Sequence, residues 1–265
     1  MKKILFLTIF SLATSAVVAD VGDNFVSIKL GSSNSSDTGI STLINQVNSA
    51  GTTTNNDLGR SNVLGISVGK YLSEHFRGEI GISQRKGFKY HTTAPPAILE
   101  NYYKADVESF AVFLNGYVDA QPMTFLQNSV TTYVGAGIGI SRNKMNPLSI
   151  HSDGVLLGTA SSNTETELAL KFALGALINL SDNVSVDLNY QYVDLGDIKS
   201  GKNLSWDTLD LVAPYSGPEI TSNEFNVGLQ ILVRVARSHG TQGSSGKQTS
   251  CSQASSLHVL QILYR

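Results

Sequence analysis

Apolar and polar residues alternate along eight long segments of this chain. In the last of them, Val227, Leu229 and Ile231 are separated by Gly228 and Gln230. Because successive side chains of a β-strand point to opposite faces, this period of two gives each segment one apolar face. The pattern therefore predicts an all-β fold with eight strands. They comprise residues 25–31, 63–72, 76–85, 107–118, 130–141, 165–180, 184–194 and 224–235.

A soluble β-sandwich would show the same alternation, so the lengths of strands and loops must decide between the two classes. Most segments have ten or more residues, close to the ~9–11 that a tilted strand needs to cross a bilayer and above the ~5–6 of soluble sheets. The connections alternate between long loops and short turns such as residues 73–75 and 181–183. This asymmetry is typical of outer-membrane barrels. We predict a transmembrane antiparallel up-and-down β-barrel of eight strands with four long extracellular loops.

The N-terminus has the features of a secretory signal peptide. A positively charged start (MKK) precedes the apolar stretch ILFLTIFSL and the small-residue cleavage site VVA. We predict a signal peptide at residues 1–19, an outer-membrane barrel at residues 20–235 and a disordered polar tail at residues 236–265. The predicted location is the bacterial outer membrane, at the cell surface.

Composition excludes several kinds of site. The formal net charge of −2 provides no global positive field, so we expect no nucleic-acid partner. The single cysteine, Cys251, cannot form an internal disulfide, and the chain has no CxxC pair or histidine cluster with the spacing of metal ligands. We expect no cofactor and no metal ion.

Two motifs contain residue types that are common in enzymes, but each has a better structural explanation. Gly135, Gly137 and Gly139 alternate within a predicted strand, whereas a dinucleotide fingerprint opens a helix. We interpret them as relief of crowding inside the barrel. Residues 151–153 (His-Ser-Asp) are adjacent in the chain and cannot converge as a catalytic triad requires, so they predict a turn. We expect no enzymatic activity.

Charged residues occur on the polar faces of the predicted strands, which would point into the barrel. Glu79 lies between Arg77 and Arg85 on one face, and Glu167 and Lys171 share a face of another strand. A buried charge must be paired to offset its desolvation. Since side chains can fill the interior of an eight-stranded barrel, we predict that these residues form structural ion pairs that plug the lumen.

Aromatic residues near the ends of the predicted strands indicate belts at the level of the lipid headgroups, where amphipathic rings are favoured. They are Tyr71, Phe76, Tyr117, Tyr133, Tyr190 and Tyr192. An alternative is that tyrosine simply favours strands.

Partner recognition is expected in the long loops. Residues 87–106 and 204–215 combine aromatic and aliphatic side chains, and tyrosine is favoured at protein interfaces. The candidate partner-binding residues are Lys89, Tyr90, Ile98, Leu99, Tyr102, Tyr103 and Trp206. Alternatively, Tyr102 and Tyr103 belong to the headgroup belt.

Three segments carry a resemblance to a known family. Residues 226–233 (NVGLQILV) resemble the terminal insertion signal of outer-membrane barrels, although the chain continues for 30 residues beyond Val235. Residues 113–119 (FLNGYVD) and 133–140 (YVGAGIGI) resemble the small opacity-type barrels, most closely the rickettsial surface-adhesin barrels.

This resemblance implies a surface antigen and adhesin whose extracellular loops contact host surface proteins. It also implies a monomer that sits in outer-membrane lipid after insertion by the barrel assembly machinery. Two alternatives stay open. One is a purely structural envelope barrel, and the other is a channel for small solutes.

Overall fold

The computed structural model describes residues 21–36, 58–94, 101–125, 128–201 and 216–234 as strands joined by turns. The predicted signal peptide and the predicted tail lie outside the described residues. No helix in these ranges is long and apolar enough to cross a membrane. The strands are β1 (Asn24–Ser35), β2 (Arg60–Tyr71), β3 (Phe76–Ala94), β4 (Asn101–Asp119), β5 (Met123–Phe125), β6 (Asn128–Met145), β7 (Leu148–Ser152), β8 (Val155–Ala160), β9 (Asn163–Asn179), β10 (Val184–Lys199) and β11 (Ser216–Val233).

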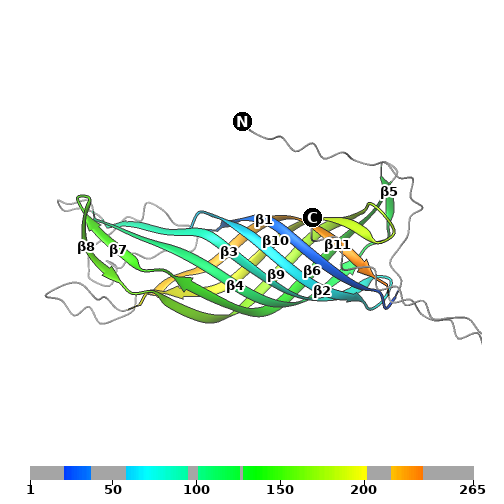
Figure 1. Ribbon diagram of the computed structural model, residues 1–265, viewed down its shortest axis with the longest axis horizontal. Helices are drawn as coiled ribbons and strands as arrows, with labels where there is room; N and C mark the ends of the chain where they lie inside the picture. Colours follow the sequence, from blue (N-terminus) through cyan, green and yellow to red (C-terminus); the bar gives the residue numbers. More distant parts are fainter. Residues whose placement is uncertain (1–20, 37–57, 95–100, 126–127, 202–215, 235–265) are drawn as a thin grey trace, which may run out of the picture. The chain divides into compact units, whose positions relative to one another are not determined.

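Eight of the described strands close into a barrel (Figure 1). Strands β1, β2, β3, β4, β6, β9, β10 and β11 each pair antiparallel with the next, and β11 pairs with β1. The predicted eight-stranded, antiparallel up-and-down barrel is confirmed. The sequence did not indicate β5, which pairs with β6, or the hairpin of β7 and β8.

The two ends of the barrel differ in their connections. The turns at residues 72–75 and 180–183 lie at one end, which we call the inner end. The hairpin β7–β8 lies at the opposite end, which we call the outer end, on the left of Figure 1.

Over most of its height the barrel is apolar outside and polar inside. On β9, Phe172 and Leu174 are exposed, whereas Lys171 and Ala173 are buried. A large exposed apolar surface is unfavourable in water, so this band around the barrel requires hydrocarbon surroundings. The predicted outward direction of the apolar faces is therefore confirmed.

Beyond this apolar band the two faces exchange character. Gly87 has a φ of 119° and marks a β-bulge in β3. After the bulge, Phe88 and Tyr90 are buried in an apolar cluster that includes Val107, while Lys89 is exposed. The outer end therefore has the apolar-in, polar-out arrangement of a barrel surrounded by water.

The predicted second loop, residues 87–106, is largely strand. Strand β3 continues to Ala94 and β4 begins at Asn101. The loop prediction is wrong here because the bulge shifts the alternation by one residue, which interrupts the period of two on which the prediction rests.

Candidate functional site

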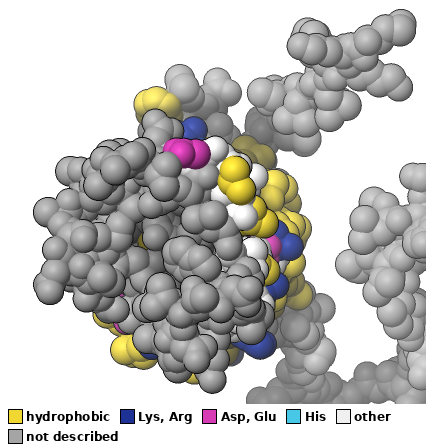
Figure 2. Space-filling view, turned by 90° about the vertical axis from the view of Figure 1, so that its left-hand side faces the viewer, with side chains coloured by type: hydrophobic (Ala, Val, Ile, Leu, Met, Phe, Trp, Pro, Cys, Tyr) yellow, Lys and Arg dark blue, Asp and Glu magenta, His cyan; other side chains and the backbone are white. Residues whose placement is uncertain are grey.

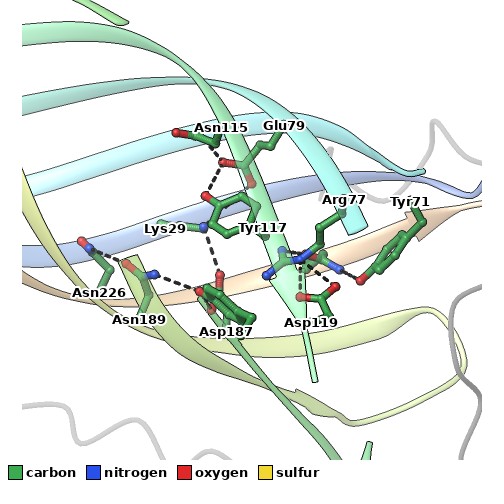
Figure 3. Close-up of polar contacts among 12 residues, drawn as sticks. Lys29, Tyr71, Arg77, Glu79, Asn115, Tyr117, Asp119, Asp187, Asn189 and Asn226 are labelled. Atoms are coloured by element: carbon green, nitrogen blue, oxygen red, sulfur yellow. Dashed lines mark hydrogen bonds and ion pairs between the residues drawn. The ribbon is translucent and has the colours of Figure 1, made fainter. Parts of the chain in front are cut away.

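The interior near the inner end contains a network around Arg77 (Figure 3). The Nε of Arg77 donates to the carboxylate of Asp119 at 3.0 Å, and its Nη1 donates to Gln230 Oε1 at 3.3 Å. The ring centroids of Tyr117 and Tyr133 each lie 4.3 Å from its Cζ. One anion and two ring faces thus compensate the buried guanidinium.

A second group lies around Lys29 and Glu79, one inward-facing position farther toward the outer end of β3. Lys29 Nζ lies 3.0 Å from Asp187 Oδ2 and 3.9 Å from Glu79 Oε2. Asn115 Nδ2 and the Tyr117 hydroxyl donate to Glu79 Oε1 at 2.9 and 3.1 Å. These contacts connect β1, β3, β4 and β10 across the lumen, as Figure 3 shows.

A third layer lies directly below the apolar cluster of the outer end. Arg85 Nη2 donates to Glu224 Oε2 at 3.1 Å, and Arg85 Nε donates to the other carboxylate oxygen. Gln191 and Ser222 also donate to this carboxylate. Both charged residues are 0% exposed, so this pair crosses the lumen without contact with solvent.

The structure buries four of the five predicted lumen charges but gives them different partners. The ion pairs of Arg77, Glu79 and Arg85 in the described part of the chain join different strands. Glu167 is half-buried, and Lys171 Nζ lies 4.8 Å from the ring centroid of Phe113 instead of pairing with Glu167 within that part. The partners that the prediction did not include are Lys29, Asp119 and Glu224.

Three of the aromatic residues predicted for the headgroup belts lie inside the barrel. Tyr71, Tyr117 and Tyr133 are 8%, 2% and 4% exposed, and the Tyr133 hydroxyl donates to Asp187 at 2.6 Å. The prediction is wrong for them because successive side chains of a strand point to opposite faces. The place of a residue in this alternation, and not its closeness to a strand end, decides which way it faces. The residues found on the outer surface are Phe76, Tyr190 and Tyr192.

The predicted partner-binding residues have different positions at the outer end. Lys89 is exposed, whereas Tyr90 is only 6% exposed because it joins the interior cluster. Tyr90 is therefore not available to a partner, which corrects that prediction. Tyr102 and Tyr103 lie on β4, where their backbones pair with β3. The residues outside the described part of the chain are Ile98, Leu99 and Trp206.

The hairpin β7–β8 presents an apolar tip that the sequence did not reveal. Ser152 pairs with Val155, and the two residues between them, Asp153 and Gly154, have φ values of 48° and 80°. Two positive φ values and an Asp-Gly pair are typical of a type I′ hairpin turn. The predicted turn is therefore present, but it lies at Asp153 and Gly154, because His151 and Ser152 belong to β7. Next to the turn, Val155 and Leu156 are 63% and 55% exposed.

The outer ends of β10 and β11 carry a cluster of carboxylates. Partial burial raises the pKa of Glu219, and the negative charge of Asp194, with which it shares a hydrogen bond, raises that pKa further. Asp197 adds to the effect. This side of the outer end therefore carries acidic groups above the apolar band.

A closed barrel with an apolar exterior and a polar, filled interior matches one known family. The sequence model of the family described as "Outer membrane protein beta-barrel domain" matches residues 4–231 of this chain. The chain belongs to this family of outer-membrane barrels. The predicted location in the outer membrane is confirmed.

Individual relatives of this outer-membrane barrel are distant. A Rickettsia bellii (strain OSU 85-389) protein named "Putative adhesin" is 29% identical over 143 residues, which cover 51% of this chain and 60% of the relative, less than two thirds of its length. The outer membrane protein PagN of Salmonella typhimurium is 26% identical over 135 residues, covering 48% of this chain and 50% of PagN. OprG of Pseudomonas aeruginosa shares the fold, with a TM-score of 0.55 and 12% identity over 83% of this chain and 100% of OprG.

We expect this outer-membrane barrel to give no stable nanosiemens-scale conductance in planar bilayers. The three interior layers fill the lumen, and the cavity lined by Lys29, Glu79 and Lys171 has a volume of only about 40 Å³, which is room for no more than a few water molecules. A general porin inserted into the same bilayers is the positive control. Stable conductance through the wild-type protein would contradict the plugged lumen and would favour the small-solute channel.

Proposed function

We propose that this protein is a surface antigen and adhesin that binds host surface proteins through its outer end. Rickettsial relatives that match about half of this chain carry the word adhesin in their names. The family consists of outer-membrane barrels, which supports binding rather than catalysis as the activity.

The observation that carries this proposal is the apolar tip of the hairpin β7–β8. Val155 and Leu156 stand at the end of a two-stranded extension, beside a tight turn, at the end of the barrel opposite to the short turns (Figure 1). Exposed aliphatic side chains on a paired hairpin can become the desolvated centre of a protein interface when a partner covers them. Lys89, on the neighbouring outer surface of β3, remains a candidate for the polar rim.

We further propose that the chain reaches its site after removal of residues 1–19 and insertion by the barrel assembly machinery, and that it acts as a monomer. Support for insertion comes from β11, in which Val227, Leu229, Ile231 and Val233 all face outward in alternation. Outer-membrane lipid contacts this face.

Replacing Val155 and Leu156 with serine should reduce attachment of a displaying, otherwise non-adherent bacterium to host cells by about tenfold. Loss of a hot-spot side chain costs upwards of about 1–2 kcal/mol of binding energy. The matched control is the double variant Met123→Ser and Phe125→Ser. It removes two similarly exposed apolar side chains from β5 at the inner end, and attachment should not change.

Two outcomes would contradict the proposal at different levels. If the hairpin variant attaches as well as the wild type, the hairpin is not the contact surface. If display of the wild-type protein adds no attachment over bacteria without it, the adhesin function fails and the purely structural envelope barrel is favoured. Surface display of every variant is first checked by antibody labelling of intact cells.

A further inference from the structure

Basic side chains gather on one outer face of the barrel, formed by β3, β4 and β6. They are the exposed residues Lys86, Lys89, Lys104, Arg142 and Lys144. The strands pair directly, so that Glu108 of β4 stands between Lys86 of β3 and Lys144 of β6. Figure 2, a view onto the outer end, shows basic side chains beside hydrophobic ones along one edge. We call these five residues the basic face.

The lower part of the basic face begins where the apolar band ends. The last outward apolar residues are Ile82 on β3 and Ile140 on β6. Arg142 follows two positions after Ile140, and Lys86 four positions after Ile82. At ~3.3 Å per residue and a tilt of ~40°, these side chains begin about 5–10 Å above the hydrocarbon. The headgroup layer of a bilayer is about 5–8 Å thick on each side. Arg142 therefore lies within this layer, and the long side chains of Lys86 and Lys144 start just above it and can reach down to it.

The three cations nearest the apolar band are poorly neutralised by the protein. Within the described part of the chain, no ion pair involves Lys86, Arg142 or Lys144. Five cations share this face with two carboxylates, Asp106 and Glu108. The carboxylate cluster of β10 and β11 belongs to other strands of the barrel. The basic face therefore has a formal net positive charge, of which Lys86, Arg142 and Lys144 are available to an external anion.

The upper part of the basic face borders a groove. Its volume is about 530 Å³, and Lys89, His91, Lys104 and Asp106 line it together with Ser149. Lys104 lies six positions beyond Phe110, which is the last outward apolar residue of β4. By the same arithmetic the groove is about 15 Å above the hydrocarbon. Its lining of cationic and hydrogen-bonding side chains fits an anionic or hydroxyl-rich sugar.

We propose that the basic face binds a phosphorylated glycolipid of the outer leaflet. Its acyl chains lie against the apolar band below Phe110, and its phosphates contact Lys86, Arg142 and Lys144. Its sugars extend outward into the groove beside Lys89 and Lys104. A lipid accounts for three features at once, namely the continuity with the apolar band, the cations at headgroup level and the groove above them. A soluble polyanion would account only for the groove. This proposal does not depend on the adhesin function.

The test uses the full-length protein reconstituted in nanodiscs of zwitterionic phospholipid. The probe is lipopolysaccharide with both lipid A phosphates, and its binding is compared with that of the same glycolipid after enzymatic removal of the phosphates. We expect the wild type to prefer the phosphorylated form by about tenfold or more, since each cation near an anionic headgroup contributes about 1 kcal/mol. The triple variant Lys86→Gln, Arg142→Gln and Lys144→Gln should lose this preference.

The matched control is the triple variant Lys70→Gln, Lys199→Gln and Arg234→Gln, which removes the same charge from β2, β10 and the residue after β11, outside the basic face, and should keep the preference. If the wild type binds both glycolipid forms equally well, this measurement alone would overturn the proposal. Equal losses in the two triple variants would also overturn it, because only net charge would then matter. So would stronger binding of a soluble heparin fragment than of the phosphorylated glycolipid, with the same dependence on Lys86, Arg142 and Lys144.

Discussion

Replacing Arg85 with alanine should lower the free energy of unfolding by about 3–5 kcal/mol. Arg85 and Glu224 are both 0% exposed, and the guanidinium holds both carboxylate oxygens. Without Arg85, the carboxylate keeps only its neutral donors, Gln191 and Ser222, which cannot balance a full charge away from water. Urea unfolding of the barrel in lipid vesicles, followed by far-ultraviolet circular dichroism and by the heat-dependent shift on gels, measures the loss.

Two further variants separate this charge effect from a general loss of packing. Lys199→Ala removes a partly exposed partner of Glu165, whose carboxylate lies 3.6 Å from Lys199 Nζ, and should cost at most about 1 kcal/mol. The double variant Arg85→Met and Glu224→Leu removes both charges together and should recover most of the stability lost in Arg85→Ala. The interpretation fails if Arg85→Ala is as mild as Lys199→Ala.

The facing of the membrane-spanning residues could be predicted from the sequence because the period of a strand fixes it. Val227, Leu229 and Ile231 all face outward, as their spacing requires. Once one residue of a segment is known to face outward, the alternation fixes the direction of every other side chain in that segment. The barrel architecture followed from eight such segments and from the alternation of long and short connections.

The partners of the lumen charges could not be predicted in the same way. The alternation along β3 shows that Arg85 points inward. The residue that it contacts depends on which strand lies across the lumen and on the register of that strand. Its partner, Glu224, is 139 residues away. Periodicity within a segment contains no information about this register, so neighbours along the strand were a poor guide to ion pairing.

The direction of the side chains at the outer end could not be predicted, because the surroundings of the barrel change along a single strand. Along β3, Ile82 faces hydrocarbon, whereas Phe88 and Tyr90 form an interior core. The bulge at Gly87 separates the part of β3 whose apolar residues face hydrocarbon from the part whose apolar residues face the interior. The sequence therefore predicts an exposed loop at Tyr90, whereas the structure buries this residue. The available signal was the alternation that resumes after Gly87, with the apolar residues now on the opposite face.

Replacing Gly139 with valine should destabilise the barrel by about 3 kcal/mol or more, at the upper end of what overpacking costs. The residue lies on the inner face of β6, where a Cβ would come within 2.1 Å of the Val112 carbonyl oxygen and 2.8 Å of the Phe113 ring. A backbone oxygen cannot rotate away as a side chain can. The interpretation of this glycine as relief of interior crowding thus has a definite geometric cause.

Gly116 provides the matched control, because it lies on the outer face of the adjacent strand β4 and a Cβ there would meet nothing within 4 Å. Gly116→Val should change the free energy of unfolding by no more than about 0.5 kcal/mol, as surface substitutions usually do, and should insert into vesicles like the wild type. Both variants place the same β-branched side chain in the same sheet, so strand propensity cancels in the comparison. Equal stability of the two variants would show that the interior at Gly139 has room for a side chain, and the close packing of the lumen would have to be abandoned at that level.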